Sequence, residues 1–90
     1  MKAVDVRITG TVQGVSFRYY TRTEAQRRGV AGWVRNEPDG SVCGHFEGAE
    51  EAVDALVGWC RHGPPHAEVD RVDVTGSTTT GADRFEVRRE

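Results

Sequence analysis

The sequence predicts an α+β fold with the element order βαββαβ and a short extra strand at the C-terminus. Three observations lead to this order: segments of alternating apolar and polar residues, two segments of helical periodicity, and Gly and Pro clusters that separate them. A chain of 90 residues can close one modest core, so we expect a single domain over residues 1–90.

The first expected element is a half-buried strand over residues 3–12. Apolar side chains alternate along it with Asp5, Arg7 and Thr9, which fall on the opposite face. One face of this strand should therefore pack on the core. The residues of that face are Val4, Val6, Ile8, Gly10 and Val12.

A helix is expected next, over residues 17–28, because this segment contains neither Gly nor Pro and is followed by Gly29. Its apolar stripe is thin, which leaves little surface for packing. The stripe consists of Phe17, Tyr20, Thr21 and Ala25.

A β-hairpin and a second helix should follow. Residues 30–35 and 41–47 are short runs with β-branched and aromatic side chains, and the Asn-Glu-Pro-Asp-Gly segment between them has turn chemistry. Residues 50–60 begin with two acids, which favour a helix N-terminus, and repeat apolar residues at helical spacing. The stripe of this helix is Val53, Leu56, Val57 and Cys60, and we expect it to pack against the apolar face of the first strand.

The rest of the chain supplies two more strands. Gly63-Pro64-Pro65 excludes continuation of the helix, and residues 69–75 return to strand alternation. Val69 is out of phase with the valines that follow, which a late start of the strand or a bulge near Asp70 would explain. A last short strand is expected around Phe85. Two helices on one face of an antiparallel sheet, with a short extra strand, give a ferredoxin-like sandwich.

Charge is distributed unevenly along the chain. Residues 1–36 carry seven Lys or Arg against two acids, whereas residues 37–90 carry five against twelve. Arg7, Arg18 and Arg22 fall in a stretch that contains no acidic residue. An anion should be attracted to this part of the protein.

Several classes of protein are disfavoured. No apolar stretch is long enough for a membrane span or a signal peptide, so we expect a cytoplasmic protein. The three histidines lack metal-site spacing. Cys43 and Cys60 lack a CxxC arrangement and should lie on opposite sheet faces, so no disulfide is expected between them. RNA binding is also disfavoured, because the sequence has no run of basic residues, although Tyr19, Tyr20 and Trp33 could stack on bases if they are exposed.

The turn between the first strand and the first helix has the composition of an anion-binding loop. It reads Gln-Gly-Val-Ser-Phe-Arg over residues 13–18. Helix N-termini leave backbone N–H groups unpaired and carry partial positive charge, so they suit a phosphate. Gly14 permits unusual backbone angles, and the planar guanidinium of Arg18 matches phosphate oxygens. Taken singly, these residues also fit an ordinary turn and a solvated surface arginine.

Two motifs together are more informative. Gly-Thr-Val-Gln-Gly-Val-Ser-Phe-Arg at residues 10–18 is followed by Gly-Trp-Val-Arg-Asn at residues 32–36. This pair resembles the motifs of the acylphosphatase family, and the similarity runs nearly from end to end. Cys43 and Gly44 depart from the family pattern at strand positions, which concerns local packing rather than the site.

The resemblance implies hydrolysis of acyl phosphates without a metal, a cofactor or a covalent phosphoenzyme. The family's catalytic arginine falls on Arg18, and its catalytic asparagine, which orients the attacking water, falls on Asn36. The implied partners are a small acyl phosphate substrate and inorganic phosphate, which is both product and competitive inhibitor. We expect a monomer that binds neither nucleic acid nor membranes. The family's phosphate-binding loop, which binds the phosphate with its backbone N–H groups, falls on Gln13, Gly14, Val15, Ser16, Phe17 and Arg18.

Such a reaction needs few side chains, because the carboxylate that leaves is already a stable anion and requires no general acid. The loop contains no cysteine, which argues against a nucleophilic phosphatase. The base that accepts the proton of the water, including an oxygen of the substrate's own phosphate, is left open. A noncatalytic anion sensor on the same fold is the main alternative, and it would make no use of Asn36. Metal transfer is a weaker alternative.

Overall fold

The computed structural model describes residues 1–89, so Glu90 of the expected domain lies outside the described residues. The elements follow the order that the sequence predicts, and no helix in this range is long and apolar enough to cross a membrane. The elements are β1 (Lys2–Thr11), α1 (Phe17–Arg28), β2 (Ala31–Asn36), β3 (Val42–Gly48), α2 (Glu50–Cys60), β4 (Glu68–Gly76) and β5 (Phe85–Arg88).

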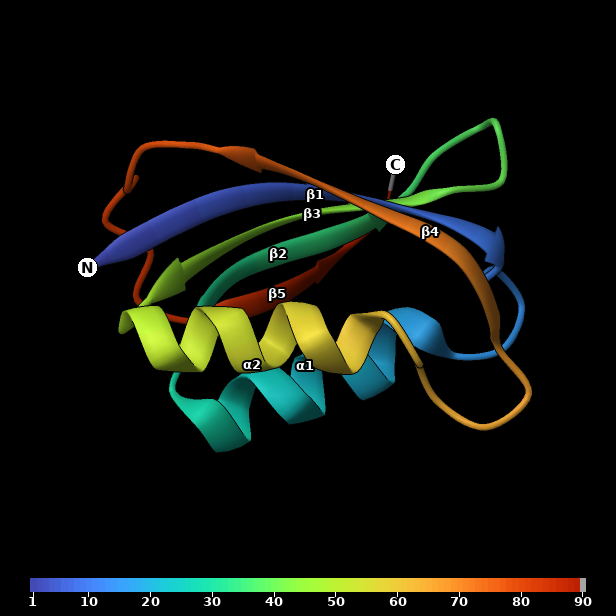
Figure 1. The fold of residues 1–90 in the computed structure, drawn as a ribbon, viewed down its shortest axis with the longest axis horizontal. Helices are drawn as coiled ribbons and strands as arrows, with labels where there is room; N and C mark the ends of the chain where they lie inside the picture. The colour runs from blue at the N-terminus through green and yellow to red at the C-terminus, as the bar shows by residue number, and fades with distance from the viewer. Residues whose placement is uncertain (90) are drawn as a thin grey trace.

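A single sheet contains the five strands in the order β4-β1-β3-β2-β5, and both helices lie on the same face of it (Figure 1). β5 pairs in parallel with β2, whereas the other pairs are antiparallel. The ferredoxin-like α+β fold is confirmed, with a sheet that is mixed rather than wholly antiparallel. The chain after β4 crosses to the opposite edge of the sheet, and this route determines the direction of β5. Strand alternation in the sequence carries no information about that route.

The bulge that the phase of Val69 predicts is present in β4. Gly10 of β1 pairs with Val69, and the register shifts at this point so that Asp70 has no partner on β1. Gly10 has a φ of 131°, and a Cβ at this position would lie 2.1 Å from the carbonyl oxygen of Glu68. The close approach of the two backbones therefore requires glycine here.

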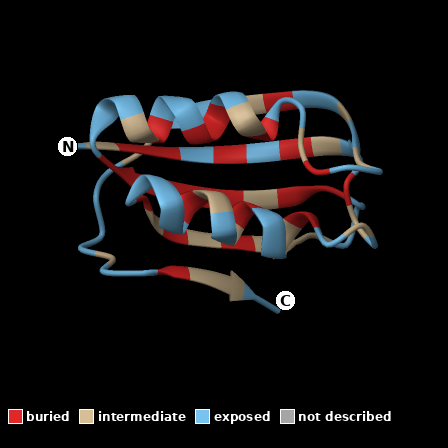
Figure 2. Ribbon diagram, turned by 90° about the horizontal axis from the view of Figure 1, so that it is seen from below, coloured by how far each residue is buried: buried red, intermediate tan, exposed pale blue. Residues whose placement is uncertain are grey.

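The core lies between the helices and the sheet, where the facing surfaces are buried (Figure 2). The predicted stripe of α2 is buried and belongs to one hydrophobic cluster with Val4, Val6 and Ile8 of β1, which confirms that the two share a core. The stripe predicted for α1 is partly wrong. Phe17, Thr21 and Ala25 are buried, but Tyr20 is 47% exposed.

The face of the sheet opposite the helices is polar. The His45 side chain on β3 lies between two carboxylates, with Nδ1 2.7 Å from Oδ1 of Asp5 and Nε2 2.6 Å from Oε2 of Glu47. Glu47 is buried and also accepts hydrogen bonds from the backbone N–H groups of residues 80–82. This network fastens the connection between β4 and β5 to the sheet.

Candidate active site

The loop between β1 and α1 has an unusual backbone. Gly14 has a φ of 76° and Ser16, the N-cap of α1, has a φ of 60°, so both lie in the left-handed region. A Cβ on Gly14 would meet no atom within 4 Å, so a side chain would fit in the available space. Glycine is favoured here because of the positive φ angle. The Ser16 side chain makes no capping hydrogen bond. These angles turn successive peptide groups toward one side of the loop.

The backbone N–H groups of this loop have no hydrogen-bond partner within the described residues. Within residues 1–89, the N–H groups of residues 14–19 donate to no carbonyl, and the series of helical bonds begins with Tyr20, which donates to Ser16 at 3.1 Å. The first turn of α1 contains no acidic side chain to offset the helix dipole. The sequence therefore folds into a cradle of donors at a positive helix terminus, as an anion requires.

Some side chains of the predicted loop serve to anchor it. Gln13 Nε2 donates to the carbonyl oxygens of Glu37 and Ser41, at 2.8 and 2.9 Å. Phe17 is buried, and its ring centroid lies 5.8 Å from that of Trp59 on α2. Gln13 was predicted as part of a loop that binds phosphate through its backbone N–H groups, and its side-chain amide has the separate role of bonding to the β2–β3 turn. The cradle is therefore built from backbone, held in place by these two side chains.

Arg18 is half-buried in the first turn of α1 and reaches toward the edge of the sheet. Its Nη1 donates to the backbone carbonyl oxygen of Arg88 at 2.8 Å, and it forms no ion pair with a carboxylate of the described residues. A carbonyl acceptor carries no net charge, so the positive charge of the guanidinium is not neutralised. Arg18 can thus add a full charge to the donors of the loop.

Asn36 ends β2 on the same side of the sheet as the cradle. It pairs with Val42, and strand alternation places it on the face of the buried Val34, toward the helices. It is half-buried, and its side-chain amide has no hydrogen-bond partner within the described residues. The side-chain amide of Gln13 bonds to the carbonyl oxygen of the adjacent residue, Glu37. Arg88, which holds Arg18, pairs with the residue before Asn36. Two hydrogen bonds from Gln13 therefore connect the loop to the turn that follows β2, and a third connects Arg18 to β5, the strand beside β2.

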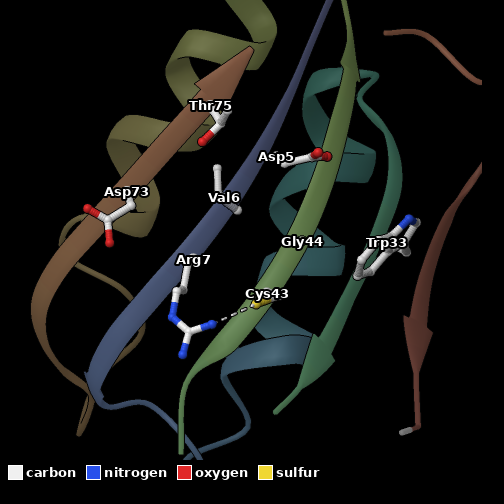
Figure 3. A pocket seen from close by; sticks show the side chains of 8 residues that line it. All are labelled: Asp5, Val6, Arg7, Trp33, Cys43, Gly44, Asp73 and Thr75. Carbon is white, nitrogen blue, oxygen red and sulfur yellow. Dashed lines mark hydrogen bonds between the residues drawn. The ribbon is translucent and has the colours of Figure 1, made fainter. Parts of the chain in front are cut away.

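Of the other two arginines in the stretch without acidic residues, Arg7 and Arg22, the first is not available to an anion at the cradle. Arg7 forms an ion pair with Asp39, and its Nη1 lies 4.0 Å from Cys43 Sγ. Arg7 and Cys43 lie on the face of the sheet opposite the helices and line a hollow of about 380 Å³ (Figure 3). Arg7 thus lies on the opposite face of the sheet from Asn36 and is not part of the cradle. Arg22, one turn after Arg18, forms no ion pair within residues 1–89.

The cysteines and histidines do not join the site. Cys60 is buried in the core, where burial raises the pKa of its thiol to about 12, and Cys43 lies on the opposite face of the sheet. Both thiols are free. Within residues 1–89, no group of three or more His, Cys, Asp or Glu is arranged to hold a metal ion.

Fold and site together define a small ferredoxin-like protein in which a strand-to-helix turn presents backbone N–H groups that have no partner within the described residues, flanked by an uncompensated arginine and an asparagine. Sequence comparisons agree with this class. The sequence model of the acylphosphatase family matches residues 4–87. The chain belongs to the acylphosphatase family.

Individual relatives are similar over almost the whole chain. An acylphosphatase from a Nocardioides species is 60% identical over 86 residues, which are 96% of this chain and 87% of that protein. An acylphosphatase from Geobacter sulfurreducens is 57% identical over 84 residues, or 92% of each chain. The crystal structure of an acylphosphatase from Bacillus subtilis superposes with a TM-score of 0.95 at 38% identity, covering 98% of this chain and 99% of that one.

Proposed function

We propose that this chain hydrolyses acyl phosphates to a carboxylate and inorganic phosphate by direct attack of water on phosphorus. The observation that carries the proposal is the row of unpartnered N–H groups at residues 14–19, next to the uncompensated charge of Arg18. The name acylphosphatase that the relatives carry supports the same substrate class. We also infer that the reaction needs no metal.

Arg18 should dominate the binding of the phosphate. A helix dipole contributes about 0.3 to 1 kcal/mol at an exposed site, whereas hydrogen bonds to charged groups contribute about 1.5 to 3 kcal/mol each. The backbone donors fix the position of the phosphate oxygens, and the guanidinium stabilises the charge that develops on them during transfer. Both interactions increase toward the transition state, so they speed the reaction as well as bind the substrate.

The chemistry then requires only a positioned water. Its oxygen forms a bond to phosphorus while the bond from phosphorus to the acyl oxygen breaks, and the bonding electrons leave with the carboxylate. An acyl phosphate dianion and water give a carboxylate and dihydrogen phosphate, so both protons of the water end on the phosphate. In this proposal the Asn36 amide orients the water in line with the leaving group.

Hydrolysis of acetyl phosphate and benzoyl phosphate in excess EDTA tests the proposal, with p-nitrophenyl phosphate as the control substrate. We expect turnover of both acyl phosphates and none of the ester, because an alkoxide or phenoxide is a poorer leaving group than a carboxylate. Inorganic phosphate should inhibit competitively, because it occupies the same cradle. Turnover that disappears with EDTA would overturn the metal-independent mechanism.

The experiment also separates the enzyme from an anion sensor on the same fold. A sensor would bind phosphate at the cradle but would leave both acyl phosphates intact. Phosphate binding by calorimetry, together with complete absence of acyl phosphate turnover, would therefore overturn the proposed function.

A further inference from the structure

Two tyrosines next to the cradle are exposed without an evident structural role. Tyr19 is 45% exposed and Tyr20 is 47% exposed, and both lie in the first turn of α1. The other exposed large apolar side chains of the described residues are Met1, which precedes β1, and Val74 on β4. Exposed aromatic surface gathered at one place is typical of a binding site.

The tyrosines line a hollow on the outer surface of α1. Its volume is about 280 Å³, and its other lining residues are Ser16 and Thr23. These positions follow the spacing i, i+3, i+4 and i+7, so the hollow runs along one stripe of the helix. Ser16 is the N-cap of α1, and its N–H is one of the unpartnered donors. One end of the hollow is therefore lined by a residue of the loop that forms the cradle.

Tyr19 lies close to two arginines of α1. The Cζ atoms of Arg18 and Arg22 lie 5.9 and 5.5 Å from the centroid of the Tyr19 ring, within the range of cation–π attraction. The two guanidiniums therefore restrict the ring. The ring is nonetheless 45% exposed, so part of it is available to a ligand that extends from the cradle along the helix.

In-line displacement gives the hollow a specific place in the reaction. Ser16 and Tyr20 are each two residues from Arg18, which corresponds to about 160° around an α-helix. The Arg18 guanidinium reaches the carbonyl of Arg88, next to the end of β2 that carries Asn36. A water held by Asn36 attacks from that flank, so the leaving group must depart on the opposite one. The hollow lies on this opposite flank.

We propose that the hollow lined by Ser16, Tyr19, Tyr20 and Thr23 binds the acyl portion of the substrate and favours aromatic acyl groups. This inference rests on the proposed hydrolysis at the cradle. A planar acyl group extending from the phosphate passes between the two tyrosine rings, which offer offset or edge-to-face contacts. A short acyl group such as acetyl leaves the hollow empty.

The ratio of kcat/KM for benzoyl phosphate to kcat/KM for acetyl phosphate tests the inference. Tyr20→Ala should lower this ratio about 3- to 10-fold, the effect of losing one aromatic contact. Tyr20→Phe keeps the ring and should keep the wild-type ratio. Val74→Ala removes exposed apolar surface on the distant strand β4 and should change neither value.

Thr23→Trp supplies a second, independent variant, because it fills the far end of the hollow without changing either tyrosine. It should lower the same ratio, and thermal melts show whether each variant remains folded. A ratio within twofold of wild type in both Tyr20→Ala and Thr23→Trp would overturn the inference while leaving the hydrolase in place. A wild-type protein that hydrolyses neither substrate would overturn the proposed function and this inference together.

Discussion

The Arg18 guanidinium donates a hydrogen bond of 2.8 Å to the backbone carbonyl oxygen of Arg88, 70 residues further along the chain. Arg88 ends β5, which runs parallel to β2, so this bond brings the guanidinium to the end of the strand that carries Asn36. The remaining N–H donors of Arg18 are still available for phosphate oxygens. The last strand of the chain therefore contributes to the architecture of the site.

Arg18→Ala should weaken phosphate inhibition and reduce kcat by about 10²- to 10³-fold, the scale for losing one strong donor to a developing anion. Both constants change because the guanidinium acts on the bound phosphate and on the transition state. Steady-state kinetics with benzoyl phosphate, with and without inorganic phosphate, gives both values. Arg27→Ala is the matched control, since Arg27 is exposed at the far end of α1 and, among residues 1–89, forms an ion pair with Glu24 alone. Equal losses in the two variants would contradict a specific role for Arg18.

Gln13→Ala should lower kcat on the order of 10-fold, because displacement of a positioned group by a fraction of an ångström is costly for catalysis. Gln13 fastens the loop to the carbonyl oxygens of Glu37 and Ser41, and without these bonds the cradle shifts relative to Asn36. Phosphate inhibition should change less than kcat, since the backbone donors remain. Gln26→Ala, an exposed glutamine near the end of α1, is the control. A wild-type kcat in Gln13→Ala would show that the two Gln13 hydrogen bonds are not needed for catalysis.

Local sequence patterns were sufficient to predict most of the fold. The α2 stripe, the stop at Gly29 and the bulge at Asp70 each follow from periodicity or from one residue out of phase, and the structure confirms all three. Tyr20 was misplaced because the α1 stripe is narrow: one helix face can bury only the positions that point directly at the sheet.

The candidate site was predictable in its loop and less so in its connections. Gly14 and the helix N-terminus carry local signals, and the structure places them as expected. The Arg18 acceptor is a backbone carbonyl on a strand whose parallel direction depends on a long crossover, so no side-chain identity could reveal it. The anchoring role of the Gln13 side chain was not predicted, because the motif gives its position in the chain but not the direction in which it points.

The His45 network should make stability depend on pH. Burial lowers the His45 pKa, but the hydrogen bonds to Asp5 and then Glu47 outweigh burial and raise it above 6.5. Because folding raises this pKa, protonated His45 makes its full contribution to the free energy of unfolding below pH 6.5, and that contribution is lost as pH rises through the pKa of the folded state. We therefore expect the free energy of unfolding in urea to fall as pH rises above 6.5. His45→Gln should lack this component, whereas His62→Gln, at an exposed position, should keep it.

Glu47 should make stability depend on pH under acidic conditions. Burial raises its pKa, but the backbone N–H of Thr80, followed by His45 and the Thr80 hydroxyl, outweighs burial and lowers the pKa to about 2. Because folding lowers this pKa, ionised Glu47 makes its full contribution to the free energy of unfolding above pH 4.5, the usual pKa, and that contribution is lost as pH falls toward 2. Urea unfolding between pH 5 and pH 2 should show this loss in the wild type, and Glu47→Gln should flatten it. An unchanged slope in Glu47→Gln would exclude Glu47 as the source.

Asn36→Ala should separate catalysis from phosphate binding. If the amide acts on the water alone, the phosphate still meets the backbone donors of the loop and the guanidinium of Arg18, so its inhibition constant should stay near that of the wild type. kcat should fall by about 10²-fold or more, because an unoriented water loses the advantage of a fixed in-line position. The fold should change little, since Asn36 is half-buried and its amide makes no hydrogen bond within the described residues. Asn36→Asp, of similar size, retains an oxygen acceptor but adds a negative charge next to the phosphate, so it should impair phosphate inhibition as well. Near-normal kcat in Asn36→Ala, with a wild-type thermal melt, would show that Asn36 only ends β2, and the water would then need another partner near the cradle.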